Sequence, residues 1–298
     1  MVSRPVAQQD RAMEQPAPRR KGRRARRLII IFVVLAAILV GADFGMAAFA
    51  EHEISQKARE QLKLTDDPSV SIKGFPFLTQ ALGGDYGHIS VYASGVPVND
   101  KLRDVELNAE LYDVIAPLSD VLNGNTKSIT IGKLDGQVTL KASDIARIAP
   151  LDKIENLRID PSSEEYVETG VDTKKKDTTT TNADGSEVTD DAKAGVRMSG
   201  ELQIAGQKVE IFCFAMIELK DGAITFAPKR LQYGNDKETT VVEDIVQAKF
   251  LKSFEATVKP GDLPFQVKPT GVKVNPGSVT IKGEMRDVTF AGLPVKGK

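Results

Sequence analysis

The chain has 298 residues, with 40 Lys and Arg against 41 Asp and Glu, one Cys and two His. One Cys excludes an intramolecular disulfide framework and a cysteine-rich zinc site, and two His exclude a multi-histidine metal centre. Residues 1–50 hold nine of the basic and three of the acidic residues, which leaves 31 basic and 38 acidic residues and a formal charge of −7 in the rest. Such an acidic body argues against general nucleic-acid binding, whose affinity comes from neutralising phosphates.

The N-terminal region combines a basic tail with an apolar segment. Residues 1–27 are rich in Pro, Gln and Arg, which predicts a disordered cytoplasmic tail. Residues 28–50 are apolar except for Asp43, and as a helix they would span about 35 Å, roughly the hydrocarbon thickness of a bilayer. Basic residues before this segment and the acidic Glu51 and Glu53 after it predict a cytoplasmic N-terminus and an extracytoplasmic body.

Two interpretations of residues 28–50 stay open. A single-pass transmembrane anchor fits their length, whereas Ala48-Phe49-Ala50 has the small-x-small pattern that precedes the cleavage site of a signal peptide. Both interpretations carry residues 51–298 across the cell membrane. The body then either stays anchored there or is secreted into the periplasmic space after cleavage behind Ala50.

Residues 51–298 predict one domain of the α+β class. Residues 51–64 are good helix formers whose apolar side chains recur every fourth position. From Val70 onward the apolar period changes to two, which is typical of antiparallel strands with one face covered. The alternating positions are Val70/Ile72, Ile89/Val91/Ala93, Val105/Leu107/Ala109/Leu111, Ile129/Ile131, Val138/Leu140, Ile224/Phe226, Val272/Val274, Val279/Ile281 and Val288/Phe290.

One predicted strand departs from this alternation. Residues 209–219 form an almost continuous apolar run, which indicates a central strand or one whose second face meets another apolar surface. Alternate residues of a strand point to opposite faces. Phe212, Phe214 and Met216 therefore share one face, and Ile211, Cys213 and Ala215 share the other.

Short helices and one long loop interrupt the predicted strands. Helices are expected at residues 77–82, at 143–149 with Ser143 as the N-cap, and at about 241–255. Residues 168–195 are rich in Lys, Asp and Thr and predict a disordered loop within the domain.

The sequence offers no recognisable catalytic machinery. Neither His52 nor His88 lies in a metal-binding or nucleophile-base pattern, and no nucleotide-binding, serine-hydrolase or zinc-protease motif is present. Carboxylate pairs such as Glu164-Glu165 fit turns and solvated faces better than a glycosidase site, and Cys213 lies in an apolar run as a small core residue. We therefore expect no catalytic residues, no metal and no cofactor.

Apolar residues carry the remaining information. Residues 74–82 place two Phe and two Leu on a turn followed by a short helix, next to the ends of predicted strands. A sheet with a doubly apolar strand and apolar helices fits a cavity that accepts a hydrophobic ligand, since ligand sites are concave and mostly apolar.

Several segments together resemble a known family. They are the arginine-rich tail, the apolar segment with Asp43, Val70-Ser71-Ile72-Lys73-Gly74-Phe75-Pro76-Phe77-Leu78-Thr79-Gln80, Ile89-Ser90-Val91, Gly136-Gln137-Val138-Thr139-Leu140 and Leu263-Pro264-Phe265. In these residues the chain resembles the LmeA-like phospholipid-binding proteins of actinobacterial cell envelopes. The resemblance covers about residues 43–295, apart from the loop at 168–195.

The resemblance implies a fold and a function. The fold is an elongated, strongly curved, barrel-like antiparallel sheet wrapped on helices around an apolar cavity, similar to tubular lipid-binding folds. The function is non-catalytic binding of phospholipids, including phosphoinositides, at the membrane, in support of envelope lipid or lipomannan-type glycolipid maintenance. Envelope glycolipid-synthesis proteins are then the expected protein partners, and nucleic acid is not one. Two rivals are a membrane-anchored envelope scaffold without a lipid cargo and an unrecognised hydrolase.

The predicted lipid-binding residues form two groups. Phe75, Phe77, Leu78 and Leu82 are expected where the lipid enters. The wall of the cavity is expected to contain Phe212, Phe214, Met216, Phe250 and Phe254.

Overall fold

The computed structural model describes residues 22–98, 102–123, 125–171, 180–181, 187–188, 192–204, 206–220, 222–234, 241–258 and 268–289. Contacts divide the chain into two compact units, Met1–Phe44 and Gly45–Lys298. Helix α1, Gly22–Leu62, begins in the first unit and ends in the second. Its part Ala25–Glu60 contains a window with a mean hydropathy of 2.7, so it is long and apolar enough to cross a membrane, a property that signal sequences share.

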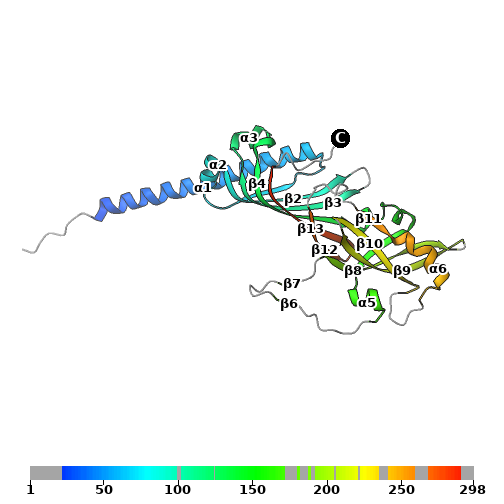
Figure 1. Ribbon diagram of the computed structural model, residues 1–298. Coiled ribbons are helices and arrows are strands. Elements are labelled where there is room, and N and C mark those ends of the chain that lie inside the picture. The colour runs from blue at the N-terminus through cyan, green and yellow to red at the C-terminus, as the bar shows by residue number, and fades with distance from the viewer. Residues whose placement is uncertain are drawn as a thin grey trace, which may run out of the picture. The chain divides into compact units, whose positions relative to one another are not determined.

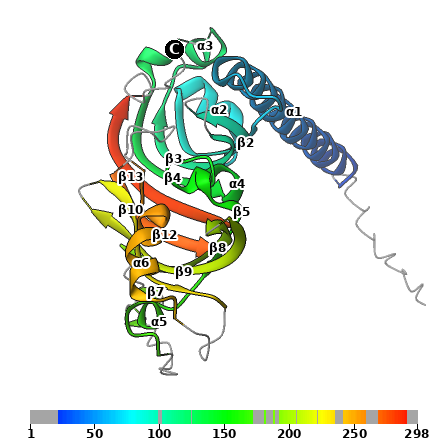
Figure 2. The ribbon, with the colours of Figure 1, turned by 90° about the vertical axis from the view of Figure 1, so that its right-hand side faces the viewer.

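Two antiparallel sheets form the second unit (Figure 1). Sheet A has the order β1 (Ser69–Lys73), β2 (Asp85–Val98), β3 (Leu102–Ile115), β4 (Thr130–Lys141), β13 (Ser278–Thr289) and β12 (Lys268–Asn275). Sheet B has the order β11 (Ala256–Val258), β10 (Ala223–Gln232), β9 (Gln207–Lys220), β8 (Lys193–Ile204) and β5 (Glu155–Pro161). The strands of sheet B curl strongly (Figure 2). The predicted α+β class with a strongly curved antiparallel sheet is therefore confirmed.

Short helices connect the strands. They are α2 (Phe77–Gly83), α3 (Leu118–Asn123), η1 (Thr126–Ser128), α4 (Ala142–Ile145), η2 (Leu151–Lys153), α5 (Glu164–Thr169), α6 (Asp244–Phe250) and η3 (Leu251–Phe254). Within the loop predicted at 168–195, strands β6 (Thr180–Thr181) and β7 (Glu187–Val188) pair with each other, while residues 172–179, 182–186 and 189–191 lie outside the described residues. Leu263-Pro264-Phe265 also lies outside them.

The largest apolar core, here called the central cluster, joins the two sheets. It contains one face of β9, namely Ile211, Cys213, Ala215 and Ile217, together with residues of β3, β4, β10, β12 and β13. The opposite face of β9 packs against α5 in a smaller group, here called the outer cluster, which consists of Tyr166, Val167, Phe214, Met216 and the half-buried Phe212. The continuous apolar run thus belongs to a central strand that is covered on both faces.

A third core, here called the helix-side cluster, lies between sheet A and the helices α1 and α2. Its buried members are Ala50, Ile72, Phe77, Ala81, Tyr86, Ala109, Leu111, Val114, Ala116, Ile131 and Leu134. Its half-buried members are Ala47, Ile54, Ile89, Val91, Ile129, Met285 and Val288.

The alternation is interrupted at the same level of sheet A in four of its strands. Tyr86 and Ile89, Leu111 and Val114, Ile131 and Leu134, and Met285 and Val288 are three residues apart, yet all belong to the helix-side cluster. Asp113 and Asp287 lie at these interruptions with φ of 52° and 51°. Gly132 lies beside Asp113, and a Cβ at position 132 would come within 2.9 Å of the Asp113 Cβ, which explains the glycine. Because of the interruption, each strand contributes apolar side chains to the helix-side cluster from both sides of this level.

Two expectations about the helices were wrong in detail. Ser143 is not the N-cap, because α4 begins at Ala142 and Lys141 occupies that position. The buried carboxylate of Asp144 instead accepts hydrogen bonds from the backbone N–H groups of Arg103 and Asp104, which ties α4 to the start of β3. The helix expected at 241–255 begins at Asp244 and continues from α6 into the 3₁₀ helix η3.

Candidate lipid-binding site

The helix-side cluster is the most open of the three apolar groups. Most members of the central cluster are fully buried, whereas Ile89, Val91, Met285 and Val288 on the inner face of sheet A are only half-buried. Half-buried aliphatic side chains keep part of their apolar surface in contact with water, and covering that surface contributes about 25 cal/mol per Å². An acyl chain laid along this face would supply such cover.

Residues 45–62 of α1 hold one side of this cluster. Three polar contacts fix the helix against the chain around β1: the Ile72 N–H donates to Glu51 Oε1 at 2.6 Å, Ser55 Oγ donates to the Pro68 carbonyl, and Arg59 pairs with Asp67 at 3.1 Å. As the residue number rises along α1, the residue number of the contacted partner falls. This part of α1 therefore runs antiparallel to β1 and the residues before it. Its first turns, with Ala47 and Ala50, consequently lie closest to α2.

Helix α2 holds the adjoining side of the cluster. It follows Pro76, whose backbone is extended, and ends at Gly84 in the left-handed region, so the helix is confined to seven residues. Phe77 and Ala81 point into the helix-side cluster and are buried. Phe75 and Leu82 remain 59% and 89% exposed, and Ile115 at the end of β3 is 57% exposed. The Ala116 N–H donates to the Gly84 carbonyl at 2.7 Å, which brings Ile115 beside the end of α2.

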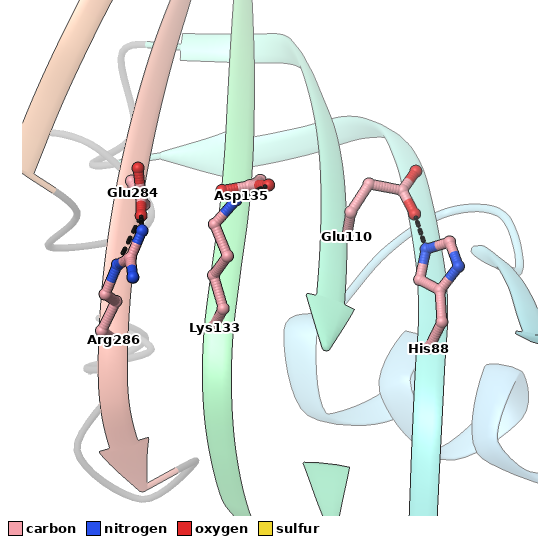
Figure 3. Close-up of polar contacts among 6 residues, drawn as sticks. All are labelled: His88, Glu110, Lys133, Asp135, Glu284 and Arg286. Atoms are coloured by element: carbon pink, nitrogen blue, oxygen red, sulfur yellow. Dashed lines mark hydrogen bonds and ion pairs between the residues drawn. The ribbon is translucent and has the colours of Figure 1, made fainter. Parts of the chain in front are cut away.

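The outer face of sheet A is polar, in contrast to the inner face (Figure 3). His88, Tyr112, Lys133 and Arg286 are aligned across β2, β3, β4 and β13, and Ser90, Glu110, Asp135 and Glu284 form the next row. Ion pairs join the rows: His88 with Glu110 at 2.7 Å, Lys133 with Asp135 at 2.8 Å and Arg286 with Glu284 at 2.7 Å. The hydrogen bond from Lys133 to Asp135 raises the pKa of Lys133. This face is suited to contact with water.

Groups suited to catalysis or metal binding do not gather in the part of the chain that the structure describes. Within those residues no three His, Cys, Asp or Glu side chains are arranged to hold a metal ion. His52 contacts Gln56, and His88 contacts Glu110 and stacks on Tyr112. Cys213 is fully buried, and burial raises the pKa of its thiol well above the usual value, which makes it a poor nucleophile.

A family model described as LmeA-like phospholipid-binding matches residues 41–284. The chain belongs to the LmeA-like phospholipid-binding family. Membership supports lipid binding, and this confirms the family expected from the sequence motifs. No curated protein and no solved structure matches the chain.

The predicted lipid-binding residues of this LmeA-like protein fall into all three apolar clusters. Phe77 belongs to the helix-side cluster, and Phe75, Leu78 and Leu82 surround it on α2 and the preceding turn. Phe254 is buried in the central cluster, and Phe250 packs against that cluster from the end of α6. Phe212, Phe214 and Met216 lie in the outer cluster. The structure therefore brings the first group together and separates it from the proposed wall residues.

The outer cluster is closed by α5. The rings of Tyr166 and Phe214 meet edge to face with centroids 4.9 Å apart, and the Arg230 guanidinium lies 5.3 Å from the centre of the Phe214 ring. Arg230 also donates to the Tyr166 carbonyl at 2.9 Å, near the C-terminal end of α5. Lipid contact at Phe212, Phe214 and Met216 stays a prediction, and it requires α5 to lift from the sheet.

Sequence reasoning missed some residues of the helix-side cluster as candidates for lipid contact. Met285 and Tyr86 were not singled out, although Ile89 and Val91 appeared in the strand alternation. Met285 continues the alternation of Val279 and Ile281, so the period of two could have revealed it. Tyr86 falls outside that period because of the interruption in the sheet, and its spacing of three from Ile89, next to Gly87, was the signal that could have revealed it.

Proposed function

We propose that the protein is a non-catalytic, extracytoplasmic phospholipid-binding protein that holds acyl chains against the helix-side cluster. The single observation that carries the proposal is the inner face of sheet A, in a chain of the LmeA-like family. On that face the half-buried Ile89 and Val91 of β2 and Met285 and Val288 of β13 flank the buried side chains of β3 and β4. Phe75, Phe77, Leu78 and Leu82 adjoin this face and are the proposed point of lipid entrance.

The division between the two faces of sheet A supports this location. An acyl chain gains free energy by removing apolar surface from water, whereas burying unpaired charges costs much more than it returns. The inner face offers aliphatic side chains, and the outer face offers the ion-paired rows of Figure 3. Phospholipid, with phosphoinositide among the candidate head groups, is therefore the proposed ligand.

The proposed cellular role is maintenance of envelope lipid or of a lipomannan-type glycolipid, with glycolipid-synthesis proteins as partners. The basic residues before Leu28 and the acidic Glu51 and Glu53 support an extracytoplasmic body. A reporter that is active only outside the cytoplasm, fused behind Lys298, should be active. Activity of a cytoplasm-only reporter at the same position would overturn the topology.

Photo-crosslinking tests the proposed lipid contact. The full chain is reconstituted in vesicles that contain a phospholipid with a photoreactive group on its acyl chain, and the labelled peptides are mapped by mass spectrometry. We expect labelling in β2 and β13 around Val91 and Met285, in addition to the apolar part of α1, which serves as an internal control. Labelling confined to α1 would contradict the proposal.

A matched pair of variants sharpens the same test. Met285→Asp places a carboxylate on the inner face, and Arg286→Ala changes the neighbouring residue, which lies on the outer face in the same strand. Labelling of the body should be lost in Met285→Asp, because the acyl chain would have to desolvate an unpaired carboxylate, and it should persist in Arg286→Ala. Equal labelling of both variants would place the lipid elsewhere.

A further inference from the structure

The end of the body at α2 carries apolar side chains that remain exposed to solvent. Leu82 is 89% exposed, Phe75 59% and Ile115 57%, and all three lie at the same end of sheet A. Exposed aliphatic and aromatic side chains gathered at one end of a domain mark an interaction surface.

The path of α1 shows which end of the body lies nearest the apolar segment of that helix. Glu51 contacts Ile72 and Arg59 contacts Asp67, so residues 45–62 of α1 lead away from α2 as the numbering rises. The apolar segment of α1 ends at Ala50, which lies in the same cluster as Phe77 of α2. If that segment spans a bilayer, the α2 end of the body is therefore the end closest to the bilayer surface.

We infer that Phe75, Leu82 and Ile115 insert into the lipid bilayer that α1 enters and so dock the body on the membrane. This inference rests on the interpretation of residues 28–50 as a transmembrane anchor, and it extends the proposed function because it places the point of lipid entrance in contact with the bilayer. A lipid chain could then move from the bilayer to the inner face of sheet A without crossing water. The occupant of this surface is phospholipid bilayer, not a protein.

The ion-paired charges of sheet A contribute little to the docking. Lys133 and Arg286 lie near this end, but Asp135 and Glu284 already pair with them. Attraction of exposed charges to anionic lipid is screened within about 8 Å at physiological salt. Docking by inserted apolar side chains is instead nearly independent of salt concentration.

Fluorescence quenching measures the insertion directly. Cys213 is fully buried, so one introduced Cys is the reactive thiol of the folded chain. Leu82→Cys and Ile115→Cys are labelled with an environment-sensitive fluorophore in the full chain, which is then reconstituted in vesicles containing acyl-chain nitroxide phospholipid. Ile245→Cys is the matched control, because Ile245 on α6 is 86% exposed and lies outside the helix-side cluster.

The expected result is a blue shift and quenching at positions 82 and 115, with neither at position 245. Quenching should change little between low and high salt. Equal quenching at 82 and 245 would overturn the inference. A blue shift at 82 without lipid quenching would also overturn it, since the surface would then be covered by a protein.

A charge variant separates this inference from the proposed function. Ile115→Asp, read by the fluorophore at position 82, should shift the equilibrium between inserted and lifted states by about tenfold or more, from the loss of one inserted Ile side chain. In detergent, where no bilayer is present, the same variant should still be labelled at Met285 by the photoreactive phospholipid. Unchanged quenching at position 82 in Ile115→Asp would refute the docking alone. Absence of Met285 labelling in detergent, with quenching retained in the chain that keeps Ile115, would refute the lipid site alone.

Discussion

Phe77 and Phe214 allow one comparison between two apolar clusters. Each side chain is 2% exposed, but Phe77 lies in the helix-side cluster and Phe214 lies beneath α5 in the outer cluster. Replacing a buried Phe with Ala typically costs about 3–5 kcal/mol, because transfer free energy is lost and a cavity remains. For a body of this size the cost corresponds to a fall in melting temperature of roughly 6–20 °C.

The two variants should differ in their response to phospholipid. Phe77→Ala opens space beside the proposed lipid chain, so bound lipid should restore part of the lost stability, as any ligand of the folded state does. Phe214→Ala opens space beneath α5 and loses the edge-to-face contact with Tyr166, so lipid should raise its melting temperature only as much as it raises that of the unchanged protein.

The assay is thermal unfolding of the full chain in detergent, with and without phospholipid, combined with photo-crosslinking of each variant. We expect lipid to raise the melting temperature of Phe77→Ala more than that of the unchanged protein. For Phe214→Ala we expect a low melting temperature, the same lipid-dependent rise as in the unchanged protein, and unchanged lipid labelling of the folded chain. The reasoning is refuted if Phe214→Ala melts like the unchanged protein but loses its lipid labelling. That result would place the acyl chain beneath α5, as the sequence-based prediction for Phe214 holds.

Three further changes probe the fold that carries the site. Asp144→Ala should cost about 1–3 kcal/mol in urea unfolding, because it leaves the two part-buried N–H donors at the start of β3 without their carboxylate acceptor. Gly200→Ala should destabilise by about 1–3 kcal/mol, since its Cβ would come within 2.4 Å of Ile154 Cγ2, whereas Gly87→Ala meets nothing within 4 Å and should be nearly neutral. Burial raises the pKa of the Cys213 thiol, so above pH 9.0 the unfolded chain loses a proton that the folded chain keeps. Stability should then fall by about 1.4 kcal/mol per pH unit from this group, and Cys213→Ala should remove that part of the slope.

Local patterns in the sequence were sufficient to predict most strands, although β5 and β11 were missed. The period of two at Val105 to Leu111 and at Val138/Leu140 corresponds to β3 and β4, where those side chains are buried. The apolar run at 209–219 indicated a strand with both faces covered, and β9 has the central cluster on one face and α5 on the other. These features depend on side chains close together in the sequence, so a single sequence reveals them.

The arrangement of the apolar clusters could not be predicted in the same way. Whether Phe214 meets a ligand or a helix depends on where α5 packs, about fifty residues away in the chain, and alternation says nothing about that contact. The side chains that face inward after Met285 depend on the interruption at Asp287, whose φ is positive, so that Val288 and not Asp287 joins the helix-side cluster. Ser143 has a side chain suited to an N-cap, but Asp144 makes the buried contacts that fix α4. Long-range packing decided each of these cases.

Native mass spectrometry of the full chain, released from mild detergent, tests the central claim most directly. The unchanged protein is compared with the double variant Val91→Asp/Met285→Asp, and circular dichroism confirms that both are folded. We predict that the unchanged protein retains phospholipid and that the double variant loses it. An unchanged protein without bound phospholipid, or equal retention by both, would contradict a lipid site on the inner face of sheet A.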